Sequence, residues 1–355
     1  MPLTVTLQAF RPVIEVGGQP QAALSANLLR MSVLENVSGL HRCEAVFKNW
    51  GTVGLGRSAT TGFLYFDRAL LDFGKHVVVK FPANAIMDGA ITAIGANYPA
   101  GSSPELTVVV EDRFRDLRLV PRSRTFQNAS DSDIMHQVAG DYGLSTSVDL
   151  HGPTYEVVAQ LNQTDLAFLR MRARLCDAEL WLQGQQLNVK SRANSGTEVV
   201  QLNLGGSLTD FTVVADTASQ PTSVNATAWD VAGKSATTAT VTDSILGAQL
   251  RGGSSGAKAV ARAFGQRPVT IPLPPIDRHV QAESTFRTHA QRFVVGHGTT
   301  AANAGIAAGA MIRLTGLGPL FTGLYYVSEV NHSFDQQTGA ITRFTVESPA
   351  LGQTQ

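Results

Sequence analysis

The sequence predicts a mainly β protein with an α+β region near its middle. Roughly the first 120 residues, and the chain from about Ser191 onward, show strand-like runs punctuated by Pro, Gly, Asn and Ser. Between these parts, helix-capping residues precede apolar residues at helical spacing. Helical patterns do not separate most of the N-terminal strands. We therefore expect antiparallel pairing in a barrel or sandwich rather than a doubly wound sheet.

The N-terminal part contains five segments with strand character. Leu3–Phe10 and Arg42–Lys48 alternate apolar with polar residues, which is typical of a strand with one buried face. Lys75–Phe81, Ala85–Ile94 and Glu105–Glu111 are rich in Val, Ile and Thr. We expect these segments to form the first β unit.

Two helices are predicted in the middle of the chain. Ser130–Asp133 is an N-cap cluster whose acids favour the positive end of a helix dipole, and Gly143 is a suitable C-cap. The second helix starts near Asn162–Asp165 and carries apolar residues on two sides. We expect it to pack between two layers. Leu180–Lys190, with Gly184 inside, reads as a hairpin.

The remaining chain is again β-like. Arg251–Gly256 has the composition of a flexible loop, Ala257–Phe264 is a possible short helix, and Val280–Phe293 has helical potential. The last strand-like segments are Met311–Thr315, Leu324–Phe334 and Ile341–Glu347, with a turn at Asp335–Gly339 and an extended Pro-rich run at Ile271–Ile276.

Composition excludes several classes of protein. The 355 residues carry 28 basic and 28 acidic side chains, and only 16% are charged. This length suits two or three domains. A chain without a basic excess is not expected to recognise nucleic acid, and low charge suits a subunit of an assembly. Of the 28 basic residues 22 are Arg, which favours buried or interfacial pairing.

The cysteines suggest a reducing environment, and the hydropathy predicts no membrane span. Cys43 and Cys176 are distant and are expected to be buried free thiols in a reducing cytoplasm. Met1–Val16 shows no secretory signal pattern. Phe293–Ile312 is uncharged, but its Gly, Ala, Thr and Asn content argues against a span.

Three patterns could carry chemistry. The first is Gly252–Gly256, which fits the G-x-S-x-G motif with Ser254 as a nucleophile. Asp277 and one of His289, His297 or His332 could complete a triad. The polar run before Ser254 and the missing βαβ series favour a flexible loop instead.

The other two patterns are less specific. Gly51–Ser58 resembles a P-loop but has Arg57 where the motif needs Lys, and no helix-like segment follows it. Carboxylate pairs could be drawn from Asp112, Asp116, Asp165, Asp177 and Glu179, but no spacing selects one. Metal-ligand spacing is absent. The residues alone thus favour a structural or interaction protein over an enzyme.

Phe126–Ile134, running on to Leu144, has the pattern "f-x-n-x-s-D-s-d-I", and Gln160–Leu169 has the pattern "Q-x-N-x-t-D-x-x-F-L". These blocks resemble the phage late control D family of contractile-tail baseplate hubs, in which the first pattern starts a helix. Trp229–Lys234 is similar to a "G-W-D-x-x-x-K" strand, although Ala228 replaces the Gly. Gly316–His332 resembles the family's terminal strands.

The resemblance implies a gp27-type hub fold, shared with the N-terminal part of type VI secretion (VgrG) spike proteins. Two tube-like β-barrel domains would flank a helical α+β region, and three subunits would form a pseudo-sixfold ring. On this chain the domains would span residues 1–120, 121–195 and 196–347, with a loop and helix insertion at about 240–292 and a tail at 348–355. With so short a tail, we expect the spike to be a separate chain, unless the sequence is part of a longer one.

The function implied is a structural hub that adapts a sixfold inner tube to a trimeric spike around an axial channel. It needs no catalytic, metal-binding or cofactor-binding residue. Its partners would be two further copies, the spike, the tube, other baseplate proteins and a cargo or tape-measure protein in the channel. The chain would be made in the bacterial cytoplasm and incorporated into the baseplate of a phage tail, tailocin or related particle.

The alternatives are a serine hydrolase using Ser254 and a receptor- or carbohydrate-binding β module. The latter has weak support, because only 7% of residues are aromatic.

Overall fold

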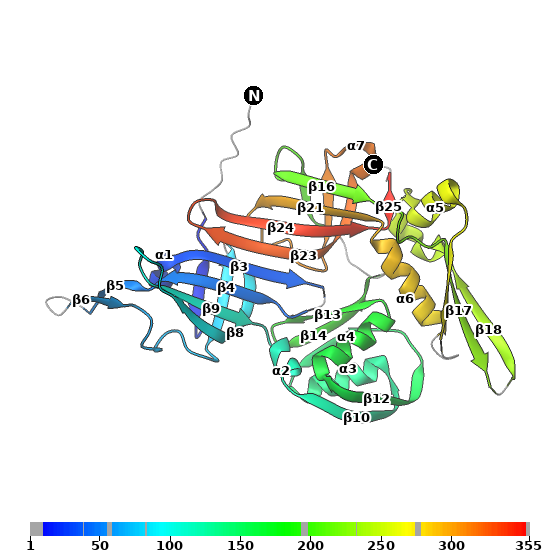
Figure 1. Cartoon of the computed structure of the whole chain (residues 1–355), viewed down its shortest axis with the longest axis horizontal. Helices are drawn as coiled ribbons and strands as arrows, with labels where there is room; N and C mark the ends of the chain where they lie inside the picture. The colour runs from blue at the N-terminus through cyan, green and yellow to red at the C-terminus, as the bar shows by residue number, and fades with distance from the viewer. Residues whose placement is uncertain are drawn as a thin grey trace.

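One 13-stranded sheet joins the two ends of the chain (Figure 1). The computed structural model describes residues 10–37, 39–54, 59–81, 84–192, 198–231, 233–273 and 278–352. The main path through the sheet runs β16-β21-β24-β23-β3-β4-β9-β8-β7-β1-β2, and β15 and β22 branch from β23. Most pairs are antiparallel, and the exception is β15 with β22. The mainly β fold class is confirmed.

The N-terminal half of this sheet comes from the first β unit. Its elements are β1 (Val13–Val16), β2 (Gln19–Pro20), α1 (Ala22–Asn27), β3 (Leu28–Asn36), β4 (Arg42–Lys48), β7 (His76–Phe81), β8 (Asn84–Asn97) and β9 (Glu105–Glu111). A hairpin of β5 (Trp50–Val53) and β6 (Thr60–Phe63) projects from it. The predicted strands at 42–48, 75–81, 85–94 and 105–111 are confirmed. The one predicted at Leu3–Phe10 lies outside the described residues except for Phe10.

The C-terminal half contributes β15 (Glu198–Asn203), β16 (Asp210–Ala215), β21 (Val294–Ala301), β22 (Met311–Thr315), α7 (Gly318–Phe321), β23 (Gly323–Asp335) and β24 (Gly339–Ser348). Strand β23 pairs with β3 from Glu329↔Asn36 to Asp335↔Arg30. Phe334 and Ala340 therefore share the first unit's core with residues such as Val33 and Phe81. In the part of the chain that the structure describes, the sheet closes into no barrel. Two separate barrels remain a prediction.

The α+β unit packs below this sheet (Figure 1). It contains α2 (Phe114–Arg118), β10 (Pro121–Ser130), α3 (Asp131–Gly140), β11 (Ser145–Asp149), β12 (Thr154–Thr164), α4 (Asp165–Leu175), β13 (Ala178–Gln183) and β14 (Gln186–Ser191). Ser130 and Asp133 form a capping box that starts α3, as their spacing predicts. Both predicted helices and the β13–β14 hairpin are confirmed.

Helix α4 differs from its prediction on one side. Leu166, Leu169 and Ala173 are buried, and so is Phe168 from the second apolar strip. Met171 in that strip is 38% exposed. The second side of α4 is thus only partly covered. Cys176 at its C-cap is half-buried rather than buried, whereas Cys43 is buried as expected.

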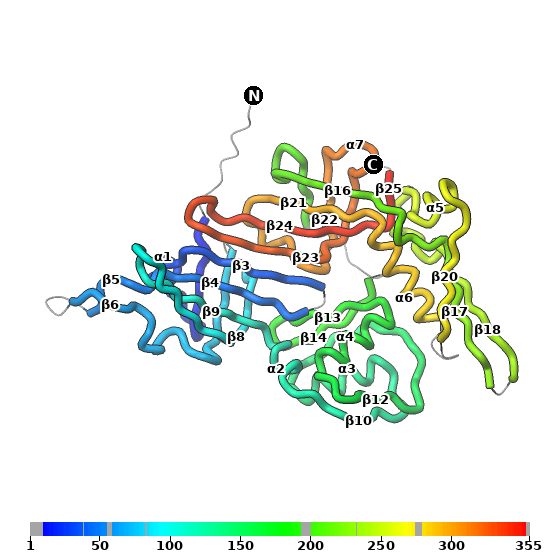
Figure 2. The backbone as a smooth tube through the Cα atoms, viewed as in Figure 1, coloured from blue at the N-terminus to red at the C-terminus, as the bar shows by residue number. Residues whose placement is uncertain are grey.

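A smaller subdomain is inserted between β16 and β21. It holds β17 (Ser223–Asp230), β18 (Ser235–Val241), the 3₁₀ segment η3 (Asp243–Leu250), β19 (Ser254–Ser255), α5 (Gly256–Phe264), β20 (Pro268–Pro272) and α6 (Arg278–Gln291). The chain ends with β25 (Ala350–Leu351), which pairs with β19. The tube view in Figure 2 shows the β17–β18 hairpin projecting at the end opposite β5–β6. No helix among the described residues is long and apolar enough to cross a membrane.

Gly89 tests how tightly the first unit is packed. A Cβ on this buried residue of β8 would lie 2.3 Å from the main-chain oxygen of Glu111. Because backbone cannot move aside cheaply, we expect Gly89→Ala to lower the free energy of unfolding by about 1–3 kcal/mol. Chemical denaturation measures this.

The matched control is Gly95→Ala in the same strand, where the nearest atom to a new Cβ is 3.7 Å away. Its stability should be close to that of the parent chain. Equal effects of the two substitutions would contradict the packing described for Gly89.

Candidate functional site

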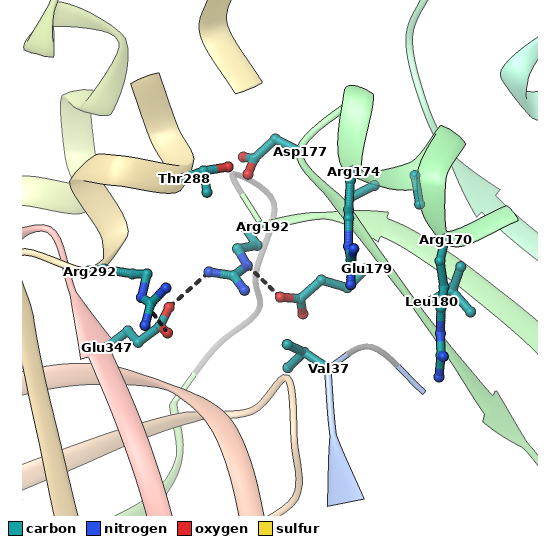
Figure 3. A pocket seen from close by; sticks show the side chains of 12 residues that line it. Val37, Arg170, Arg174, Asp177, Glu179, Leu180, Arg192, Thr288, Arg292 and Glu347 are labelled. Carbon is teal, nitrogen blue, oxygen red and sulfur yellow. Dashed lines mark hydrogen bonds and ion pairs between the residues drawn. The ribbon is translucent and has the colours of Figure 1, made fainter. Parts of the chain in front are cut away.

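Arg192 lies where the α+β unit meets the main sheet (Figure 3). Its Nε donates to the carboxylate of Glu179 in β13, and its Nη1 donates to Oε2 of Glu347 in β24 at 2.9 Å. The guanidinium also lies 5.1 Å from the ring centroid of Tyr326 in β23. One side chain thus connects two units through three contacts.

The network is shielded from water. Glu179 and Glu347 are 9% and 8% exposed, and the Arg192 side chain is 18% exposed. Burial raises the pKa of Glu179, and the positive charge of Arg192 opposes that rise. Burial disfavours the charged guanidinium as well, but the neighbouring carboxylates raise the pKa of Arg192 overall. Buried pairs of this kind cost much when one partner is removed.

A pocket of about 310 Å³ adjoins the network. It is lined by Val37, Arg170, Ala173, Arg174, Asp177, Ala178, Glu179, Leu180, Arg192, Thr288, Arg292 and Glu347. These residues come from the turn after β3, from α4, β13, α6 and β24, and from positions just after α4, β14 and α6 (Figure 3). The pocket therefore marks the junction of all the major units.

Asp177 and Ser284 attach α6 to this junction. The Asp177 N–H donates to Ser284 Oγ at 3.1 Å, and Ser284 Oγ donates to the Arg174 carbonyl at 2.6 Å. Burial raises the pKa of Asp177 to about 7. Its Oδ2 is buried without a hydrogen-bond partner among the described residues. The C-terminal end of α4 is thus held by the middle of α6.

The five carboxylates considered from the sequence have different fates. Asp177 and Glu179 share the pocket. The Asp165 carboxylate already accepts three hydrogen bonds: Arg124 and Gln160 donate to it at 2.8 Å, and Tyr142 donates at 2.7 Å. These contacts attach α4 to strands β10 and β12, which is a structural role for the carboxylate rather than a catalytic one.

The other two carboxylates of that group lie near α2. Asp112 accepts main-chain N–H groups from His41 at 2.8 Å and Phe114 at 3.0 Å. Asp116 is half-exposed beside Arg113 and Arg115 at 3.9 and 3.6 Å. No cluster of three or more metal-binding side chains occurs in the described parts of the chain.

Among the described residues, Ser254 forms no catalytic triad. It lies in strand β19, and the neighbouring Ser255 caps α5 by accepting the Lys258 N–H at 3.1 Å. His297 bonds to Thr345, and His332 is buried in the sheet and bonds to Thr342. Asp277 lies outside the described residues. A strained turn at the serine, which the motif requires, is missing, since the positive φ values here belong to Arg251 and Gly252.

The P-loop-like segment also differs from its motif. Gly51–Val53 belongs to β5 and pairs with β6 in a hairpin, so these glycines do not lead from a strand into a helix. Residues 55–58, including Arg57, lie outside the described part.

Sequence reasoning missed the residues that form the junction. Arg192 and Glu347 are 155 positions apart, so no local pattern pairs them. The only signal was the preference for Arg over Lys, which suits buried bidentate contacts. Asp177 and Glu179 were considered, but for a different role.

Known proteins share this fold. The sequence matches the family described as the Alg8 N-terminal domain over residues 71–336. The 43 kDa tail protein of prophage MuSo2 from Shewanella oneidensis is 14% identical with a TM-score of 0.68, covering 96% of this chain and 98% of that one. A tail protein of Neisseria meningitidis MC58 is 13% identical with a TM-score of 0.69, covering 95% and 96%.

A third structure extends the likeness to secretion systems. An Escherichia coli type VI secretion component, described as similar to the T4 tail proteins gp27 and gp5, is 11% identical with a TM-score of 0.61. The match covers 96% of this chain and 79% of that protein. No curated protein sequence matches the chain. The chain thus shares the fold of phage tail proteins, while the two barrel domains and the trimeric ring remain predictions.

Replacing Arg192 tests the junction. Arg192→Met keeps the length of the side chain but leaves Glu179 and Glu347 without their shared cation. We expect a loss of about 3–5 kcal/mol in unfolding free energy. Without the guanidinium the pKa of the Glu179 carboxyl rises further in the folded state, so the loss should grow from pH 5 to pH 9.

The control is Arg292→Met in the same pocket. Arg292 is 67% exposed and lies 3.9 Å from Glu347, so its removal should cost below about 1 kcal/mol. If the two variants unfold alike at each pH, Arg192 does not hold the units together.

Ser254 and Ser255 form a second matched pair. Ser255 is fully buried and donates to Asp243 at 2.6 Å in addition to capping α5. Thermal denaturation should show Ser255→Ala losing about 1–3 kcal/mol. Ser254→Ala should stay within about 0.5 kcal/mol of the parent. The reverse order would show that the helix cap is misplaced.

Proposed function

This chain belongs to the family of the Alg8 N-terminal domain, and from that premise and its fold we propose that it is the structural baseplate hub of a contractile injection machine. The observation that carries the proposal is the end-to-end match with two tail proteins, each covered to 96% or more. Similarity to a type VI secretion component supports an injection system in the wider sense.

The protomer has surfaces suited to an assembly. The β5–β6 hairpin exposes Trp50 at 36% and Phe63 at 42%, with their rings 5.1 Å apart. The β17–β18 hairpin exposes Trp229 at 58% and Val231 at 78%. These hairpins project from opposite ends of the protomer (Figure 1). Exposed apolar side chains at projecting ends are typical of surfaces that a partner covers.

The internal joints support a mechanical role. A subunit that matches two symmetries must keep its parts in a constant relative position. The pairing of β3 with β23 and the Arg192 network both couple parts of the chain that are distant in sequence. The chemistry of the junction is that of a rigid connection, because its charged groups bind one another.

The finer proposal follows the hub family. Three copies form a ring with pseudo-sixfold symmetry, built from the units at residues 1–120, 121–195 and 196–347 with the 240–292 insertion. The inner tube stacks on one face, a trimeric spike docks on the other, and cargo or a tape-measure protein lies in the axial channel. The chain is made in the bacterial cytoplasm and acts in the baseplate without cofactors or catalysis.

Assembly of the purified chain with its spike tests this role. Native mass spectrometry at tens of micromolar should show a species of about three times the 37.7 kDa chain, alone or bound to the spike. Trp229→Ser removes a half-exposed ring at the tip of a hairpin. It should reduce the assembled fraction at least tenfold while leaving the melting temperature unchanged.

Two results would count against the hub. One is a chain that stays monomeric at every concentration and ignores both spike and tube protein. The other is a low-resolution image of the particle in which the ring between tube and spike is made of a different protein.

A further inference from the structure

A groove of about 1100 Å³ lies between the first β unit and the α+β unit. One side is formed by the start of β8 and the end of β9, and the other by β13 and its turn into β14. Val37 and Glu179 line both this groove and the Arg192 pocket. The groove is thus a second hollow at the same junction.

The floor and one wall of the groove suit an extended polypeptide. Half-buried Trp181 and Leu182 supply apolar surface, and Ile86 and Met87 are buried beneath the opposite side. Strand β13 is the edge of its three-stranded sheet, whose order is β11-β14-β13. An edge strand can pair with an added strand, which takes its specificity from pockets for alternate side chains.

Two buried carboxyl groups, those of Glu35 and Asp112, line this groove. Glu35 accepts the Ala308 N–H at 3.3 Å, and Asp112 accepts only main-chain N–H groups in its recorded bonds. They are 7% and 6% exposed. Within the described residues neither forms an ion pair. Glu111 beside them differs, because both its oxygens accept from Arg118 at 2.8 and 2.6 Å.

The surrounding charges do not neutralise this pair. Burial raises the pKa of Glu35 to about 7 and that of Asp112 to about 6, and the charge of Asp112 adds to the rise at Glu35. Burial lowers the pKa of His41 to about 4, so His41 is neutral. The other charged or titratable groups of the lining are His76, Asp88, Glu111, Arg113, Arg115, Asp116 and Glu179. Arg170 acts on Asp112 from longer range.

The position of Glu35 strengthens the case. It follows Met31 and Val33 on the buried side of β3, where strand alternation places apolar residues. An acid at such a position costs free energy unless a partner compensates it. Supplying a positive charge from outside would provide that compensation.

We propose that this groove binds an extended segment of a partner protein, with one lysine or arginine side chain placed between Glu35 and Asp112 and apolar residues against Trp181 and Leu182. Charge complementarity selects the basic residue, and the edge of β13 selects the extended conformation. A metal ion fits less well, because no three ligands converge in the described residues. The inference goes beyond the hub role.

The probe is a capped hexapeptide with one lysine among valines and threonines. The control peptide is identical except that glutamine replaces the lysine. Calorimetry with the isolated chain at pH 8 should give at least tenfold tighter binding for the lysine peptide. Affinity should rise from pH 5.5 to pH 8, because the two carboxyl groups ionise over that range. Near pH 6.5 binding should release protons, seen as a dependence on buffer ionisation enthalpy.

Glu35→Gln is the informative variant, since its amide oxygen can still accept the Ala308 N–H. A raised folded-state pKa means that Glu35 costs stability above its unfolded value of 4.5 and most of all above about 7. The variant should therefore melt no lower than the parent at pH 8, and its preference for the lysine peptide should vanish. Glu44→Gln, at an exposed pair with Arg42, should keep the preference.

Equal binding of the two peptides, or no binding of either at millimolar concentration, would overturn the groove proposal. So would a preference that survives Glu35→Gln. The test uses the isolated chain and needs neither ring nor spike, so it can fail while the hub role stands, and the reverse also holds.

Discussion

The pairing of β3 with β23 is the constraint on which the architecture depends. It joins residues about 300 positions apart and merges the two ends of the chain into one sheet. Asn331 donates to Ser32 across this seam at 3.1 Å, and buried His332 packs its ring 5.7 Å from Phe81. Closing so long a loop costs entropy, which the shared apolar core must offset. Without this pairing the first unit would lose Phe334 and Ala340 from its core.

The α+β unit is attached to the completed sheet through polar contacts. Arg192 reaches strands β13 and β24, and Ser284 ties α6 to the end of α4. Charged contacts have strict geometry, so they fix the orientation of the unit more sharply than apolar packing does. The same junction leaves two hollows, one occupied by the Arg192 network and one lined by Glu35 and Asp112. A rigid joint and a binding groove thus share one boundary.

Predictions from the sequence succeeded where the cause is local. The capping box at Ser130 and the apolar spacing after it predict α3, and Gly184 predicts the β13–β14 hairpin. The sequence was uninformative where the cause is distant. The residues around Ser254 match the G-x-S-x-G pattern in sequence, but the fold places that serine in a short strand, where it pairs with Leu351. Asp177 and Glu179 could be nominated from the sequence, yet their shared cation could not.

The sequence by itself determined the order of β, helical and β segments, the positions of the main helices, and a charge-poor surface. These follow from periodicity, capping and composition, which act over a few neighbouring residues. Only the tertiary structure decided that the two β parts share one sheet, that Arg192 pairs with Glu347, and that Glu35 is buried without a cation. Each of these depends on residues brought together from distant parts of the chain. Their energies are set by burial, which no local pattern records.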